Sequence, residues 1–139
     1  MSIHSVSVAT AALFLVGVPH VAHAQAQDDS LLGTWRDPKD TVHVRTEPCG
    51  DRVCGVVVWA SDAAVAAARR GGTGELVGTT VFRNFKQAKP NVWRGKVYAP
   101  DVRMTFSGTL TVDDNELRGK GCVLGGIVCK TRTWERVTD

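Results

Sequence analysis

The sequence has no dense block of like charge and no long apolar run, and these two absences exclude several classes of protein. Its 17 Lys and Arg residues stand against 14 Asp and Glu, a formal charge of +3, and both signs are interspersed along the chain. A dedicated nucleic-acid binder would concentrate its cations, so we expect no nucleic-acid partner. With 43% hydrophobic and 22% charged residues among 139, the composition predicts one globular domain.

Residues 1–24 contain no Asp, Glu, Lys or Arg. Their apolar run, Ala9–Val18, is about half of the roughly 20 residues that a membrane-spanning helix needs. It is followed by Pro19 and the triplet Ala22-His23-Ala24, a pattern typical of a secretory signal peptide cleaved before Gln25. We therefore expect a periplasmic or secreted protein without a transmembrane segment in its mature form. Its parts would be a flexible leader over residues 25–30 and a folded domain over residues 31–139.

The absence of any Cys-x-x-Cys pair argues against a redox-active dithiol and against a zinc ribbon. The four cysteines, Cys49, Cys54, Cys122 and Cys129, all follow the leader, and an oxidising compartment lets such thiols pair. Three connectivities are open in principle. The short spacings each enclose a turn-like loop and favour two local disulfides, Cys49 with Cys54 and Cys122 with Cys129, each worth roughly 2–2.5 kcal/mol. We expect no metal ion and no cofactor.

Catalytic constellations are also scarce. Once residues 1–24 are removed, His43 is the only histidine, so a nucleophilic serine has a single candidate base. His43 alternates with Val42 and Val44, which predicts a place on the wet face of a strand. Most carboxylates fall in turn-like segments instead of pairing as glycoside hydrolysis requires. The sequence identifies no catalytic residue, and we expect a protein that is not an enzyme.

Alternation with a period of two runs through most of the mature chain. Thr41–Glu47 and Arg103–Val112 alternate apolar and polar residues, as strands with one covered face do. The apolar run Val53–Trp59 predicts a strand buried on both faces, and Ser61–Arg70, with five alanines, predicts the one helix. About eight short strands with one short helix indicate an all-β, meandering antiparallel barrel or sandwich. The remaining strands are expected at Gly33–Trp35, Thr80–Phe85, Val92–Tyr98, Glu116–Lys120 and Thr131–Arg136.

The two ends of this pattern resemble the lipocalins and calycins. Gly33-Thr34-Trp35 opens the first strand and Trp134-Glu135-Arg136 closes the last. The resemblance implies a lipocalin-like barrel whose end is closed by Gly33 and Trp35 beneath a late arginine. Arg136, or Arg132 on the same face, would stack over Trp35 in a cation–π contact of roughly 0.5–2 kcal/mol.

A longer succession of motifs runs from Leu31 to Val137. The motifs are Gly33-x-Trp35, Cys49 to Cys54-Gly55 with Trp59 just after, Trp93-Arg94-Gly95 with Tyr98-x-Pro100, Phe106-Ser107-Gly108, Leu117 to Gly121-Cys122, and Trp134-x-Arg136. Together they are similar to the exported bacterial family called domain of unknown function 2147. That resemblance implies an exported, lipocalin-like barrel with a role in binding small hydrophobic molecules and no established activity.

The bulky strand residues lead to two hypotheses about function. An eight-stranded barrel is either filled by its side chains or leaves room for one small ligand. We expect a small hydrophobic or amphipathic ligand inside the barrel, and the oligomeric state stays open. The alternative is a structural or interaction protein of the cell envelope with a filled barrel and no ligand. The candidate lining residues, chosen by parity and bulk, are Val57, Trp59, Trp93, Val97, Met104, Phe106 and Leu110.

Overall fold

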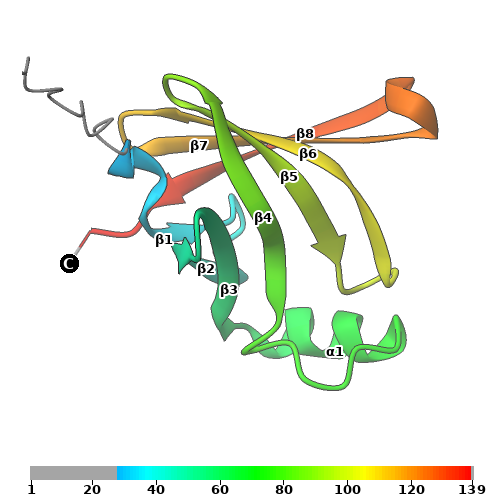
Figure 1. Ribbon diagram of the computed structural model, residues 1–139. Helices are drawn as coiled ribbons and strands as arrows, with labels where there is room; N and C mark the ends of the chain where they lie inside the picture. Colours follow the sequence, from blue (N-terminus) through cyan, green and yellow to red (C-terminus); the bar gives the residue numbers. More distant parts are fainter. Residues whose placement is uncertain (1–27, 139) are drawn as a thin grey trace, which may run out of the picture.

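Eight antiparallel strands form one closed barrel, in which each strand pairs with the next and the last pairs with the first (Figure 1). The structure is a computed structural model and describes residues 28–138, so the predicted signal peptide lies outside the described residues. The all-β barrel with one short helix is confirmed. Each predicted strand is present, with its ends moved by a few residues.

The elements follow one another as a simple meander. The strands are β1 (Gly33–Arg36), β2 (Val42–Cys49), β3 (Arg52–Ala60), β4 (Thr80–Lys89), β5 (Val92–Ala99), β6 (Met104–Asp113), β7 (Glu116–Val123) and β8 (Val128–Arg136). The α-helix α1 spans Asp62–Arg70, and two short 3-10 turns are η1 (Asp29–Leu31) and η2 (Leu124–Gly126).

The helix α1 begins at Ser61 because the serine side chain caps it. The Ser61 hydroxyl oxygen accepts a hydrogen bond from the backbone N–H of Ala64 at 3.2 Å, which satisfies one of the free donors of the first turn. The helix buries Ala68, and Leu76 in the following loop is also buried in the core. Together they cover part of the barrel end where β3 stops and β4 begins (Figure 1).

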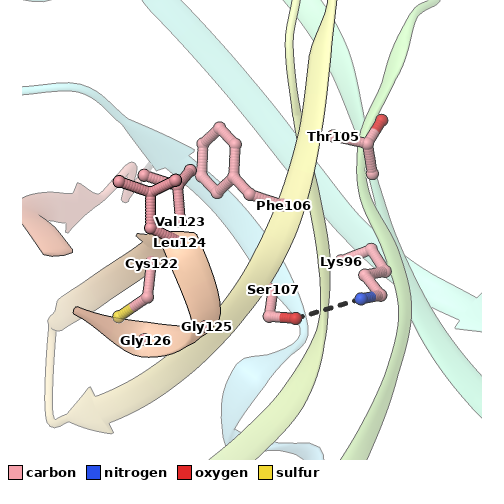
Figure 2. A pocket seen from close by; sticks show the side chains of 9 residues that line it. All are labelled: Lys96, Thr105, Phe106, Ser107, Cys122, Val123, Leu124, Gly125 and Gly126. Atoms are coloured by element: carbon pink, nitrogen blue, oxygen red, sulfur yellow. Dashed lines mark hydrogen bonds between the residues drawn. The ribbon is translucent and has the colours of Figure 1, made fainter. Parts of the chain in front are cut away.

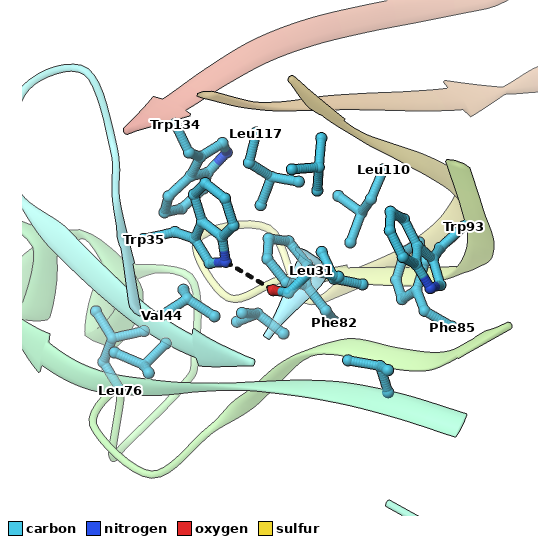
Figure 3. Packing of buried hydrophobic residues seen from close by; sticks show 14 of the residues in the cluster. Leu31, Trp35, Val44, Leu76, Phe82, Phe85, Trp93, Leu110, Leu117 and Trp134 are labelled. Carbon is cyan, nitrogen blue, oxygen red and sulfur yellow. Dashed lines mark hydrogen bonds between the residues drawn. The ribbon is translucent and has the colours of Figure 1, made fainter. Parts of the chain in front are cut away.

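The interior of the barrel is filled by aromatic and aliphatic side chains (Figure 3). Trp35, Phe85 and Leu117 have no exposed surface. The ring of Phe82 lies edge-on to two others, 5.9 Å from Phe85 and 5.8 Å from Trp134, an arrangement that favours ring pairs beyond the area they bury. These large rings, together with the aliphatic side chains of the core, occupy the middle of the barrel.

One close approach explains a glycine in β5. A Cβ atom at Gly95 would lie 2.7 Å from both the Cγ of Phe85 and the carbonyl oxygen of Arg83. The Phe85 ring therefore lies directly over the backbone of the neighbouring strand. Large and small residues on adjacent strands fit together in this way in the interior of small barrels.

The alternation fails near the end of β3. His43 pairs with Trp59 and Val44 pairs with Val57, so Val58 is an extra residue in a β-bulge. The bulge turns the indole out of the barrel: Val57 is 1% exposed, whereas Trp59 is 45% exposed and stacks on His43 with ring centroids 4.7 Å apart. The prediction that this strand is buried on both faces was wrong, because its outer side, including Val56, is only half-buried on the barrel surface.

Both local disulfides that the spacing favoured are present. Cys49 and Cys54 join the ends of β2 and β3 around their turn, and Cys122 and Cys129 join β7 and β8 at the base of η2. The barrel is a meander, so these two bridges lie at opposite ends of it.

The segment Asp28–Ser30, which the sequence assigned to a flexible leader, is held against the barrel. The Asp28 carboxylate accepts hydrogen bonds from the backbone N–H groups of Ser30 and Asn91 and from the side-chain amide of Gln87, at 2.9–3.1 Å. Asp29–Leu31 then forms η1 and inserts Leu31, which has no exposed surface, into the core. The contacts of this segment with the β4–β5 turn could not be read from its polar composition.

The seam that closes the barrel is short. Strands β1 and β8 share two residue pairs, Trp35 with Arg136 and Arg36 with Glu135. Strand β8 stays paired with β7 as far as Val128. The β7–β8 hairpin therefore extends beyond the closed part of the barrel and carries η2 at its far tip, at the upper right of Figure 1.

Candidate binding site

One end of the barrel is sealed by Trp35 and Arg136. The guanidinium carbon of Arg136 lies 4.1 Å from the centroid of the Trp35 ring, and its nitrogens donate to the carbonyl oxygens of Leu32 at 2.8 Å and Ser30 at 2.6 Å. Gly33 makes room for this group, since its φ is +140° and a Cβ there would lie 2.5 Å from an Arg136 nitrogen. This end leaves no entrance for a ligand along the barrel axis.

Arg132, the other arginine considered for this seal, lies elsewhere. It is exposed and lines an open hollow of about 270 Å³ together with the β1–β2 turn. The Asp37 carboxylate, 5% exposed, holds that turn by accepting from the backbone N–H of Val42 at 2.8 Å and the hydroxyl of Thr41 at 3.0 Å. Burial alone would raise the pKa of Asp37, but hydrogen bonds from the Val42 and Thr41 backbones outweigh it and the pKa is lowered. Asp37 is thus an ionised, structural carboxylate.

The predicted lining residues separate into three groups. Val57, Trp93 and Leu110 are 1–2% exposed and belong to the packed core, with Val97 packed partly against it. Trp59 and Met104 are 45% and 51% exposed: Trp59 lies beyond the bulge, and Met104 stands at the first position of β6. Phe106 is half-buried and lines an open pocket. The structure does not bring the seven residues together around one cavity.

The pocket beside Phe106 lies between the β7–β8 tip and strands β5 and β6, and it has a volume of about 550 Å³ (Figure 2). Its apolar part is Phe106, Val123 and Leu124. Its polar part includes the ammonium of Lys96, which donates to the Ser107 hydroxyl at 3.0 Å. The complete lining is Lys96, Thr105, Phe106, Ser107, Cys122, Val123, Leu124, Gly125 and Gly126.

A family of known sequences matches the part of the chain that forms the barrel and the pocket. The family described as "Uncharacterized protein conserved in bacteria (DUF2147)" matches residues 33–136. The chain belongs to DUF2147. The matched region begins at Gly33 and ends at Arg136, the two residues that meet at the sealed end. No curated protein and no solved structure matches the chain.

In this DUF2147 chain the register explains how the polar part of the pocket forms. Lys96 pairs with Ser107, and Ser107 pairs with Cys122, so the three residues form one row across β5, β6 and β7. The row ends at the disulfide, and η2 follows immediately. Adjacent residues of a strand point to opposite faces, so this row lies on the outer face of the sheet, whereas Phe106 and Val123 lie on the inner face with Leu110.

Sequence reasoning missed most of this pocket. Alternation along a strand predicts which strand residues point inward, whereas Leu124, Gly125 and Gly126 belong to a turn. The available signal was the apolar stretch between the last two cysteines, which is unusually rich in Val, Leu and Ile for a hairpin turn.

Within residues 28–138, no three His, Cys, Asp or Glu side chains gather as a metal site. None of the helices in that same part of the chain is long and apolar enough to cross a membrane.

Proposed function

We propose that this DUF2147 protein is exported and binds a small amphipathic anion, an alkyl chain with an acidic head, in the pocket beside Phe106. The observation that carries the proposal is the lining of an open hollow of about 550 Å³, which is bordered by apolar Phe106, Val123 and Leu124 and, on the outer face of the sheet, by the ammonium of Lys96. Ligand pockets in proteins span about 300–1,000 Å³ and place a few polar groups in a mostly apolar lining.

The polar side of the pocket favours an acidic head group. The Lys96 ammonium carries three donors, and Ser107 and Thr105 add two hydroxyls beside it. A hydrogen bond between such a cation and a carboxylate contributes roughly 1.5–3 kcal/mol. On the apolar side, each methylene buried against Phe106, Val123 and Leu124 would contribute about 0.8 kcal/mol.

The ligand is proposed beside the β7–β8 tip because the middle of the barrel is occupied by side chains. Val57, Trp93 and Leu110, three of the residues expected to line a central cavity, pack against the core instead. Phe106 is the one predicted lining residue that also lines the pocket.

Two observations support export. Residues 1–24 have the composition of a signal peptide. The described part of the chain holds its four cysteines in two disulfides, and disulfides persist in oxidising compartments such as a periplasm or the exterior of the cell.

Dodecanoate and dodecanol together test the proposed ligand class, because they share an alkyl chain and differ in charge. We expect Lys96→Gln to weaken dodecanoate binding about tenfold, the loss of roughly 1.4 kcal/mol from one charge-assisted contact, and to leave dodecanol binding unchanged. Phe106→Ala should weaken both ligands. Isothermal titration calorimetry measures all three proteins.

Lys86→Gln changes another exposed lysine, on β4 outside the pocket, and is the matched control. The proposal fails if the wild-type chain takes up neither ligand in a saturable way, or if the Lys96 and Lys86 variants bind dodecanoate equally well.

The filled core favours a second function, a structural or interaction protein of the cell envelope. Trp59, 45% exposed and supported by His43, offers a partner an aromatic contact on the outer face of the barrel. Under this function the titration shows no saturable uptake of dodecanoate, so the same experiment separates the two.

A further inference from the structure

The tip of the β7–β8 hairpin exposes large aliphatic side chains to solvent. Leu124 is 73% exposed, Ile127 is 85% exposed and Val128 is 48% exposed. Single exposed apolar residues are ordinary, but a cluster of three at one protruding point marks a surface that contacts something apolar.

The backbone of the tip fixes this exposure. Leu124 has a φ of +53°, and Gly125 and Gly126 follow at +67° and +92°. The left-handed region disfavours an L residue with a large side chain, and such conformations persist where the surrounding structure enforces them. Here the Cys122–Cys129 disulfide closes the turn from below. The tip is therefore a constrained structure at the far end of the hairpin, away from the sealed end of the barrel (Figure 1).

The parts of β7 and β8 next to the tip carry lysines and arginines but no Asp or Glu. From Leu117 to Trp134 the chain contains no Asp or Glu but holds Arg118, Lys120, Lys130 and Arg132. Arg118 forms an ion pair with Glu116 at 3.0 Å, and Lys120 and Lys130 are exposed. Exposed aliphatic side chains with lysines behind them complement a lipid surface, which has an apolar interior and anionic head groups.

We propose that the β7–β8 tip docks the protein onto anionic lipid bilayers. Leu124 and Ile127 enter the boundary between head groups and acyl chains, while Lys120 and Lys130 meet the lipid phosphates. Lipid fits the tip better than a protein partner does, because the tip lacks the Trp, Tyr and Arg anchors that dominate protein interfaces. The docking surface shares Leu124 with the ligand pocket, but Ile127, Lys120 and Lys130, which the test changes, are not among the pocket's lining residues.

Vesicle co-sedimentation tests the proposal on the chain as the producing cell processes it, with one N-terminus verified by mass spectrometry for all variants. The vesicles are phosphatidylcholine alone, or phosphatidylcholine and phosphatidylglycerol at 3:1. We expect partition onto the anionic vesicles only, with loss in 0.5 M NaCl. Ile127→Ser should weaken partition about tenfold, and Lys120→Gln with Lys130→Gln about fivefold per charge removed.

The matched controls are Val77→Ser, an exposed valine in the α1–β4 loop, and Lys86→Gln with Lys89→Gln on β4. Equal partition of the tip variants and their controls would overturn the proposal, as would no partition of the wild-type chain or salt-independent binding to both vesicle types. Self-association that Ile127→Ser abolishes, seen by light scattering without any vesicle binding, would also overturn it, since a second copy would then cover the tip.

Discussion

The Arg136 side chain makes a cation–π contact and two hydrogen bonds at the sealed end of the barrel. Its guanidinium lies over the Trp35 ring and donates to two backbone carbonyls, those of Leu32 and Ser30, that belong to the segment entering β1. The loss of the donors would cost these two part-buried hydrogen bonds. A lysine could supply the charge but not the planar fork that makes both hydrogen bonds while stacking on the indole.

At the scale of single residues we predict that Arg136→Ala lowers the free energy of unfolding by about 2–4 kcal/mol, the sum of a cation–π contact and charge-assisted hydrogen bonds. Arg132→Ala is the control, because Arg132 is exposed and makes neither contact. It should change stability by no more than about 0.5 kcal/mol. Urea unfolding followed by tryptophan fluorescence measures both, and equal losses would contradict the assigned seal.

At the scale of elements, the barrel depends on how strands fit where large and small residues meet. Phe85 has no exposed surface and lies over Gly95 of the neighbouring strand, where a Cβ would also meet the Arg83 carbonyl oxygen. Close-packed interiors are sensitive to even one added carbon.

We therefore predict that Gly95→Ala destabilises the barrel by about 1–3 kcal/mol through overpacking. Gly74→Ala is the matched change, since a Cβ at Gly74 meets nothing within 4 Å. That variant should be neutral or slightly more stable. Thermal unfolding followed by circular dichroism compares the two, and a tolerated Gly95→Ala would show that Phe85 can move.

The regularity of each strand decided how well the sequence could predict it. Regular alternation identified β2 and β6 because their side chains keep a period of two along most of each strand. In β4 the period breaks: Phe82 and Phe85 are three residues apart yet both buried, because Asn84 adopts a φ of +54° between them. Trp59 was assigned to the lining for a similar reason, since the bulge at Val58 depends on pairing with β2 and leaves no local signal.

At the scale of the whole molecule, two disulfides at opposite ends supplement a small core. The pocket and the η2 tip lie at the end closed by Cys122–Cys129, where the barrel wall extends past its seam. The sequence predicted the bridges from their spacing, but not the pocket. That pocket depends on the conformation of a turn and on a row of side chains from three strands, which only the register brings together.

We predict that reducing both disulfides lowers the free energy of unfolding by roughly 4–5 kcal/mol, about 2–2.5 kcal/mol for each short loop. The two bridges are far apart, so double-alanine replacement of each pair should account for about half, and the two losses should add. Urea titrations with and without dithiothreitol give the values. Unchanged midpoints under reduction, with thiols shown to be free by mass spectrometry, would contradict the prediction.

The two residue pairs between β1 and β8 join segments that are made at different times during synthesis. Strand β1 pairs with β2 on one edge and with β8 on the other, where Trp35 meets Arg136. Contacts so distant along the chain form late because of the loop entropy they cost. Until β8 has been made, the barrel cannot close, and β1 and β7 are the unpaired edges of an open sheet that could join the edge of another chain.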